Sequence, residues 1–566
     1  MINFKLELAE MLAGSDLGMD LDEILSLIEI PPDRDMGDFA FPCFKLAKAF
    51  RKAPPIIAQE LSEKLALPPS IDRAQPLGPY LNFFVSRGVL AREVITEVLT
   101  RGEGYGSSDI GKGKRAVVEF SSTNIAKPFH IGHIRSTVIG NALNHIYRFC
   151  GYDTTSVNYL GDFGTQFGMM IAAYKLWGDR DRIHQDPIRE LLKLYVDYNQ
   201  LALEDPEKMD EARRWFNELE NKNPEAVELW TWFKEISLGE FNRVYKMLGI
   251  EFDSYNGESY SSQFIEGVIE ELNEKKLLVE SDGAMIIDLE DVDLPNMIVI
   301  KRDGSSTYIT RDIATAQYRK REYDFDKNIY VVGSEQILHF NQLKACLSKM
   351  GYAWSKDCVH VPFGMISLKD VTLSTRKGQV VFLEDVLNLA IEKTRDIIDA
   401  RNPDLENKEE VSKQVGIGAV MFQELFNGRI KDYVFDWDSA LNFEGETGPY
   451  VQYTQARAGS ILAKAGTTVD PDFDSSAITM DTEAQLIMEI YDFPRRVVEA
   501  MEKYEPSYVT RQLIEISKCF NKFYNNCPIL SADEKTKRAR LALVAATQQV
   551  IQNGLALLGI QSPEKM

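Results

Sequence analysis

Residues Ser121–Leu143 read SSTNIAKPFHIGHIRSTVIGNAL, and this stretch decides how the rest of the chain is interpreted. It follows the short apolar run RAVVEF (Arg115–Phe120), which predicts a buried strand. A helical pattern begins near Ile131. In a parallel sheet, ligands bind where a strand ends and a helix begins, and the positive end of that helix favours an anion such as phosphate. The stretch therefore predicts a phosphate-binding turn.

Two of the six histidines of the chain, His130 and His133, lie in this turn. At a spacing of i, i+3 they share one face of the first helical turn, from which imidazoles can donate hydrogen bonds to phosphate oxygens. Gly132 leaves room for a flat ring to approach the backbone, and Lys127 adds a positive charge. A histidine pair alone is more often a cap or a packing feature. Zinc is a further alternative, but no HExxH pattern and no nearby cysteine supports it.

The regions around this turn predict several domains. Strand patterns at 155–164, 328–336 and 359–368 alternate with helical patterns, which indicates a parallel α/β sheet within residues 106–384. A highly charged helical segment around 180–260 interrupts the alternation and predicts an insertion. The chain is therefore expected to be a multidomain α/β protein.

The two ends of the chain have different patterns. Residues 1–105 mix strand-like runs at 38–42 and 80–86 with helical patterns, which predicts a small α+β domain. Residues 102–114 are rich in Gly and Ser and predict a linker. From about Asp385 the strand signals stop. A connecting helical region is expected at 385–445 and an α-helical bundle at 446–566.

Composition limits the class of protein. The chain has 566 residues, of which 44% are hydrophobic and 27% charged, as is ordinary for a globular protein. No apolar run approaches the roughly 18 residues of a membrane span, and no secretory signal is visible. The six cysteines are scattered without a CxxC pair, which argues against structural zinc and fits a reducing cytoplasm. A net charge of −22 disfavours nucleic acid as a partner unless a basic face is local.

Several motifs together resemble one family. HIGH after a strand is the first signature of class I aminoacyl-tRNA synthetases and related nucleotidyl transferases. The stretch Ser121–Leu143 resembles arginyl-tRNA synthetases in particular. The resemblance extends, in the family's order, to YLGDFGTQFG, YITRDIATAQYR, VVGSEQILHF, LSTRKG, GETGPYVQYTQAR and LLGIQSPEKM. It implies a class I Rossmann-type catalytic domain, a tRNA-contacting N-terminal domain, a stem-contacting region at 385–445 and an anticodon-binding bundle.

The resemblance also implies an activity. An arginine–tRNA ligase uses ATP to convert L-arginine to arginyl-adenylate, releasing pyrophosphate, and then transfers the arginyl group to the terminal ribose of its tRNA. Family members depend on tRNA for the first step. The implied partners are ATP, L-arginine and the tRNA for arginine. Mg²⁺ would arrive with ATP without a dedicated protein site, and no zinc or membrane is implied. A cytoplasmic monomer is expected.

The resemblance assigns roles in the phosphate chemistry. His130 and His133 would stabilise charge on ATP, with Gly132 beneath the adenine. The second class I signature, usually KMSKS, corresponds to TLSTRKG (372–378), where Thr375 replaces the key lysine. Family members with this departure carry a lysine before HIGH, and Lys127 occupies that position. Arg376 and Lys377 are expected to assist catalysis.

Other family contacts map onto this chain by motif. The implied arginine-binding residues are Asn124, Glu258, Tyr308, Asp312 and Gln336. The remaining ATP-site residues are His339, Met365, Ile366 and Ser374. The anticodon-binding role implied for the bundle favours stacking of bases on aromatic rings, for which the candidates are Tyr450, Tyr453, Phe523 and Tyr524. Aromatic residues on helices are more often part of the core, and this alternative stays open for each of the four.

Three alternatives stay open at the level of sequence. The first is a class I synthetase for another amino acid, whose metal-dependent forms are disfavoured because no paired cysteines are present. The second is an ATP-dependent nucleotidyl transferase of the HIGH superfamily that uses no tRNA, which would leave the helical bundle without a role. The third is a tRNA-binding relative without enzymatic activity, which the full set of motif residues disfavours.

Overall fold

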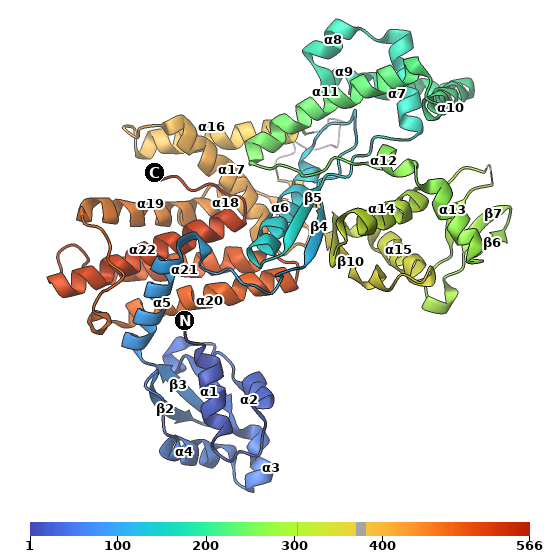
Figure 1. Ribbon diagram of the computed structural model, residues 1–566. Coiled ribbons are helices and arrows are strands. Elements are labelled where there is room, and N and C mark those ends of the chain that lie inside the picture. The colour runs from blue at the N-terminus through green and yellow to red at the C-terminus, as the bar shows by residue number, and fades with distance from the viewer. Residues whose placement is uncertain (303, 370–380) are drawn as a thin grey trace.

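The computed structural model describes residues 1–302, 304–369 and 381–566 (Figure 1). The N-terminal unit forms a lobe at one end of the molecule, and a group of insertion helices lies at the opposite end. The parallel sheet lies between them, flanked by the C-terminal helices. None of the helices in the described part of the chain combines the length and apolar character needed to cross a membrane.

The N-terminal lobe is a small antiparallel sheet covered by helices. Its strands follow the order β1-β3-β2, with the bounds β1 (Phe39–Pro42), β2 (Ile71–Leu77) and β3 (Tyr80–Val85). Its helices are α1 (Phe4–Ala13), α2 (Leu21–Leu27), α3 (Leu46–Phe50) and α4 (Pro54–Lys64). Phe4, Phe41 and Phe83 are buried between the two layers. The predicted α+β character and two of the three strands are confirmed.

The next segment departs from the predicted linker. Helix α5 (Arg87–Arg101) packs on α20 (Asp481–Glu502) and α22 (Glu534–Leu557) of the C-terminal bundle. Tyr105, in the Gly-rich stretch that follows, is buried, and its hydroxyl donates to the Ile490 carbonyl at 2.9 Å. The glycine content of residues 102–114 predicted a free linker, but the buried Tyr105 holds this stretch against the C-terminal bundle. By packing, the N-terminal lobe ends near residue 86.

The central sheet has four parallel strands in the order β10-β9-β4-β5. Their bounds are β4 (Arg115–Glu119), β5 (Asp153–Val157), β9 (Lys327–Gly333) and β10 (Cys358–Phe363). Val117, Val118, Ile329 and Val361 are buried, as expected for strands covered on both faces. The predicted parallel sheet is confirmed. Two of the predicted strands differ from the observed ones. The strand predicted at 155–164 is observed earlier, as β5, and the strand predicted at 359–368 is observed as two strands, β10 and β11 (Ile366–Leu368).

Two excursions leave this sheet. The predicted insertion is helical, with the bounds α7 (Thr165–Trp177), α8 (Arg180–Gln185), α9 (Pro187–Glu204), α10 (Pro206–Glu220) and α11 (Pro224–Leu248). Both α10 and α11 begin with proline after a side-chain cap, Asp205 and Asn223 respectively. A second excursion forms an antiparallel sheet that the sequence analysis did not anticipate, with β6 (Leu278–Ser281), β7 (Ala284–Ile287) and β8 (Met297–Ile300).

The C-terminal part is the predicted helix bundle, with one exception. Its other main helices are α16 (Leu383–Arg401), α17 (Lys408–Phe426), α19 (Gly448–Ala465) and α21 (Ser507–Asn526). Strand β12 (Tyr433–Phe435) pairs in parallel with β11, so the expectation of no strand after 385 is wrong. A three-residue strand is too short to give a periodic signal in the sequence.

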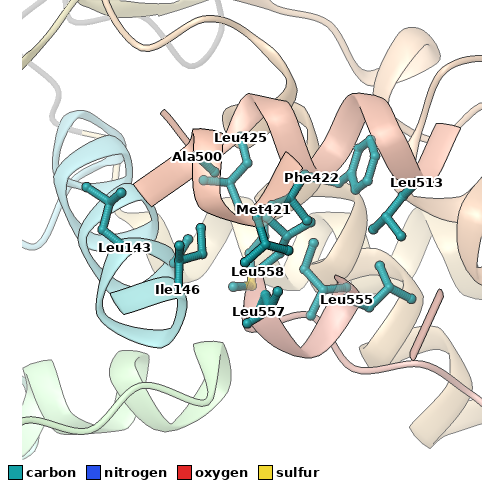
Figure 2. Packing of buried hydrophobic residues seen from close by; sticks show 14 of the residues in the cluster. Leu143, Ile146, Met421, Phe422, Leu425, Ala500, Leu513, Leu555, Leu557 and Leu558 are labelled. Carbon is teal, nitrogen blue, oxygen red and sulfur yellow. The ribbon is translucent and has the colours of Figure 1, made fainter. Parts of the chain in front are cut away.

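The helix after the two histidines, α6 (Ile134–Phe149), joins the sheet to the bundle. One side of α6 packs on β4, β5 and β9, and another on α17, α20 and α22. Figure 2 shows Leu143 and Ile146 of α6 beside Met421 and Leu425 of α17, in a single apolar cluster. The helix that carries the candidate site is therefore held by two domains at once.

Candidate active site

Several of the predicted catalytic and substrate-binding residues lie at the carboxyl ends of neighbouring parallel strands. Strand β4 ends at Glu119 and leads into the turn 121–133, called the histidine turn below. Strand β5 ends at Val157 and leads into YLGDFG. Strand β9 ends at Gly333 and leads through a short turn into α15 (Ile337–Lys349). Since these three strands are adjacent, segments far apart in sequence meet at one edge, as open α/β sheets require for ligand binding.

The two imidazoles are fixed by backbone hydrogen bonds. The Gly132 amide donates to Nδ1 of His130 at 3.1 Å, and the His130 amide donates to Nδ1 of His133 at 3.2 Å. The ring centroids are 3.9 Å apart. Each Nδ1 is thus an acceptor, which places the proton of a neutral ring on Nε2. The turn presents two oriented Nε2–H donors.

The electrostatics of the turn keep these rings neutral. Burial lowers the pKa of His130, and burial together with the His130 charge lowers the pKa of His133 to about 3. The nearby Lys127 ammonium adds to this effect on His133. Near pH 7 the pair therefore acts through hydrogen bonds and dipoles, and the positive charge of the turn comes from lysine.

Gly132 is required by the histidine itself. A Cβ at this position would lie 2.9 Å from both Cε1 and Nδ1 of His130, so a larger residue would displace the ring. The Lys127 ammonium lies 5.8 Å from the centroid of Tyr195, a residue of insertion helix α9. The Lys127 side chain therefore extends from the histidine turn toward the helical insertion.

Two of the residues predicted to bind arginine, Tyr308 and Asp312, lie at the start of α14 (Tyr308–Tyr323). Asp312 Oδ2 is 2.7 Å from Nε2 of His339, and the Tyr308 ring lies 4.9 Å from the His339 ring. The structure thus brings His339, predicted for ATP, into contact with residues predicted for arginine. Gln336 is half-buried one turn before His339.

A second carboxylate comes from α12 (Glu258–Ser262). Burial raises the pKa of Glu258 to about 7; the Arg311 charge opposes this, and the Asp312 and Asp162 charges add to it. Asp162 accepts hydrogen bonds from the Ser259 amide and hydroxyl and pairs with Lys234 at 2.6 Å. This buried anchor fixes the turn that carries Glu258.

A third carboxylate, Glu119, was missed by the sequence analysis. It is the last residue of β4, is buried, and pairs with Arg319 Nη2 at 2.6 Å. Burial raises its pKa, the Arg319 charge opposes this, and the nearby Asp312 charge adds to it. An acidic residue at the end of an apolar strand, directly before the ligand turn, was the available signal. Glu119, Glu258 and Asp312 are called the acidic cluster below.

The structure describes some of the remaining predicted site residues, while those of the second signature lie outside the described ranges. The Asn124 side chain lies on Gly161, where a Cβ would come 2.2 Å from its Oδ1. Met365 is 60% exposed, and Ile366 follows it at the start of β11. Ser374, Thr375, Arg376 and Lys377 lie outside the described residues.

The C-terminal bundle contains a hollow of about 580 Å³, called the bundle hollow below. Its wall includes Tyr450, Tyr453, Arg457, Asn521 and Met566. The Arg457 guanidinium lies 4.7 Å from the Tyr453 ring centroid and 5.3 Å from that of Tyr524. Both tyrosines are partly exposed.

Phe523 requires a correction. It was predicted to offer a stacking surface, but its side chain is 0% exposed and packs against Phe520 in the core of the bundle. Helix α21 turns successive residues in different directions, so that Tyr524 faces outward where Phe523 faces inward. Sequence alone could not assign the two faces of this helix.

The potential metal ligands of the described residues do not converge. In the ranges that the structure describes, no three His, Cys, Asp or Glu side chains meet at one metal position. Five of the six cysteines are buried.

Three known family models match successive parts of the chain. Residues 3–85 match the arginyl tRNA synthetase N terminal domain, residues 94–437 match the class I (R) tRNA synthetase catalytic domain, and residues 451–566 match the DALR anticodon binding domain. Relatives named arginine–tRNA ligase from Halothermothrix orenii and Clostridioides difficile are each 54% identical, with 100% of both chains covered.

Solved structures with a similar fold include two arginyl-tRNA synthetases. The arginyl-tRNA synthetase of Thermus thermophilus matches with a TM-score of 0.78 and 27% identity, covering 100% of each chain. The Plasmodium falciparum arginyl-tRNA synthetase matches with the same TM-score at 22% identity, covering 95% of this chain and 94% of that one, and supports the fold alone.

Proposed function

The chain belongs to the class I arginyl-tRNA synthetase family and is an arginine–tRNA ligase, and we propose that it activates arginine between the histidine turn and the acidic cluster. Its substrates are ATP, L-arginine and the tRNA for arginine. One sheet edge is lined by two neutral histidines and by three carboxylates, of which Glu119 is buried and Glu258 and Asp312 are half-buried, and this arrangement carries the proposal.

The first chemical step is an attack of the arginine carboxylate on the α-phosphorus of ATP. Pyrophosphate leaves and arginyl-adenylate forms. A terminal ribose hydroxyl of tRNA then attacks the arginyl carbonyl carbon, and AMP leaves. Negative charge on the α-phosphate oxygens grows in the first step, so the Nε2–H groups of His130 and His133 would stabilise it from fixed positions. Catalysis is then mainly positioning and electrostatics.

The acidic cluster suits a guanidinium, which has five donors and no acceptor. We assign Asp312 and Glu258 as direct acceptors, with the Tyr308 hydroxyl beside them. His339 would hold the Asp312 carboxylate in place. Glu119, already paired with Arg319, would add negative potential. We assign Asn124 and Gln336 to the amino and carboxylate end of the substrate.

The phosphate side of the site relies on Lys127. Its charge would compensate for Thr375 in the second signature, because an ammonium can approach a phosphate from either side of the site. Met365 and Ile366 would border the ATP site, and we keep the assisting roles of Arg376 and Lys377 as proposals. Mg²⁺ would enter with the ATP phosphates.

The two ends of the molecule would hold the tRNA. We assign the N-terminal lobe to the tRNA elbow and the bundle hollow to an unstacked anticodon base. Tyr453 and Tyr524 offer exposed rings, and Arg457 lies against both. We propose that the protein works as a monomer in the cytoplasm.

A charging assay tests the proposed function. The protein is incubated with ATP, total tRNA and labelled arginine, lysine, leucine or cysteine, and charged tRNA is counted. Charging is expected with arginine alone. Equal charging with another amino acid would overturn the assignment. Pyrophosphate exchange is expected near background without tRNA, whereas strong exchange with no charging would favour a nucleotidyl transferase.

A further inference from the structure

A buried arginine lies directly behind the histidine turn. Arg135, in the first turn of α6, is 0% exposed. Its Nη1 donates to the Gly364 carbonyl at 2.9 Å and to the Lys431 carbonyl at 2.8 Å. These two carbonyls precede β11 and β12 respectively, so one guanidinium ties the start of both strands to the helix that follows His133.

The same guanidinium contacts the C-terminal bundle. Its Nε lies 3.2 Å from Oε2 of Glu424, a residue of α17 that is also 0% exposed. The Tyr433 hydroxyl donates to the other oxygen of Glu424, and the Tyr433 ring lies 5.2 Å from the Arg135 guanidinium. Tyr433 is the first residue of β12 and pairs with Ile366. We call Arg135, Glu424 and Tyr433 the buried joint.

The joint determines where the segment Gly364–Ile366 lies. The Met365 amide donates to Asp432 Oδ1 at 2.6 Å, and Gly364 has no room for a Cβ, which would lie 2.5 Å from the same oxygen. Met365 and Ile366 thus have little freedom relative to β12. Since β12 is connected to α6 through Arg135 and Glu424, their position relative to His130 and His133 depends on the joint.

Stability alone does not explain such a group. A buried ion pair often contributes no more than an apolar set of equal volume, because desolvation offsets the attraction. Its benefit is more often a specific geometry. Here the geometry connects the helix that follows the histidine turn to the segment Gly364–Ile366, which we propose borders the ATP site.

Building on the proposed function, we propose that Arg135, Glu424 and Tyr433 are positioning residues for adenylate formation. They hold the strand that carries Met365 and Ile366 in a fixed place relative to the histidine turn. None of the three needs to touch substrate for this role. A displacement of about 1 Å at a reacting centre can cost on the order of 100-fold in rate.

The test compares two chemically matched pairs of variants. Arg135→Lys keeps the charge and loses the bridging of two carbonyls. Its control is Arg540→Lys in the C-terminal bundle, where Arg540 pairs with Glu483 at 2.6 Å and donates to the Pro528 carbonyl. Tyr433→Phe removes one buried hydroxyl, and Tyr105→Phe removes another that is remote from the joint.

Each variant is assayed for kcat and for the KM of ATP in tRNA charging, well below its unfolding temperature, and for tRNA affinity by direct binding. We expect kcat to fall at least about 30-fold in Arg135→Lys and about threefold to tenfold in Tyr433→Phe, with tRNA affinity within about twofold of wild type. Both controls should keep kcat within about twofold while their melting temperatures fall.

A merely structural joint gives a different pattern. Arg135→Lys would then lose melting temperature but keep kcat per folded molecule, like Arg540→Lys, and the inference would be overturned. If Arg135→Lys does not fold, Tyr433→Phe is compared with Tyr105→Phe instead. A kcat per folded molecule that is the same in these two variants would then overturn the inference. The wild-type protein is assayed first for charging with arginine. Failure there refutes the proposed function, whereas failure confined to the variant comparison refutes only the joint.

Discussion

At the scale of single residues, function depends on which atoms carry protons. The Nδ1 atoms of His130 and His133 accept hydrogen bonds from backbone amides, so Nε2 is the ring nitrogen that each histidine can offer to a ligand. A carboxylate such as Asp312 gains its orientation from His339. The residue types were readable in the sequence, but the pairings were not, since His339 lies 27 positions from Asp312.

Asp312→Asn should separate arginine binding from ATP binding. The change keeps the size of the side chain and removes the charge that a guanidinium needs. A hydrogen bond to a charged group contributes about 1.5–3 kcal/mol, so the KM for arginine should rise roughly 10-fold to 150-fold. The KM for ATP should stay within about twofold.

Asp291→Asn is the matched control for this change, because Asp291 is exposed and pairs with Lys349 on the surface. Steady-state charging kinetics at varied arginine and varied ATP give both constants. An equal rise in the two KM values for Asp312→Asn would contradict the assignment of Asp312 to arginine.

His133 should make stability depend on pH. The pKa of His133 is about 3 in the folded protein and about 6.5 in the unfolded chain. Between these values the unfolded chain binds the extra proton, so the free energy of unfolding falls as pH decreases, by up to about 1.4 kcal/mol per pH unit. Above pH 6.5 this contribution is constant.

Urea unfolding at pH 7.5 and 5.5 measures the effect. The wild-type protein should lose about 1 kcal/mol more than His133→Asn on going to the lower pH. The same loss in both proteins would show that His133 is not held neutral by the fold.

At the scale of elements, the site depends on how closely α6 approaches the sheet. Gly140 of α6 faces Phe120, where a Cβ would lie 2.0 Å from the Phe120 Cβ. The helix therefore lies directly on the strand end that leads into the histidine turn. Periodicity predicted both the strand and the helix, but the closeness of their contact is a property of the packed pair.

Gly140→Ala should be destabilising although alanine favours helices. The methyl group would overpack the contact with Phe120, which typically costs about 1–3 kcal/mol. Gly239→Ala in α11 is the control, since beyond its chain neighbours and the backbone of its own helix no heavy atom lies within 4 Å of its Cβ position. That variant should gain up to about 1 kcal/mol from helix propensity. Urea unfolding compares the two, and equal effects would show that α6 can move away from β4.

At the scale of the whole molecule, the proposed active site and the bundle hollow are lined by different residues, and the elements that carry them share one apolar core. The Tyr147 hydroxyl of α6 donates to the Met501 carbonyl of α20, and Arg429 donates to the carbonyls of Pro362 and Tyr504. These bonds join the sheet to the bundle. Because none of the residues that line the hollow belongs to the histidine turn, a substitution in the hollow can change tRNA binding without touching the residues proposed to bind ATP and arginine.

Tyr453→Ala should weaken tRNA binding selectively. Loss of a stacked base costs about 1–3 kcal/mol, so the KM for tRNA should rise roughly 5-fold to 150-fold while the KM values for ATP and arginine stay within about twofold. The dependence of tRNA affinity on salt should not change, because a stacking ring contacts no phosphate. A reduced salt slope would instead place Tyr453 on the phosphate path.

The sequence by itself determined the parallel sheet, the helical insertion, the C-terminal bundle and the position of the histidine turn. These follow from local periodicity and from motifs that are contiguous in the chain. The tertiary structure alone decided that Phe523 is buried, that α5 belongs to the bundle by packing, that Glu119 joins the acidic cluster, and that Arg135 meets Glu424. Each of these depends on contacts between segments distant in sequence, which no local pattern encodes.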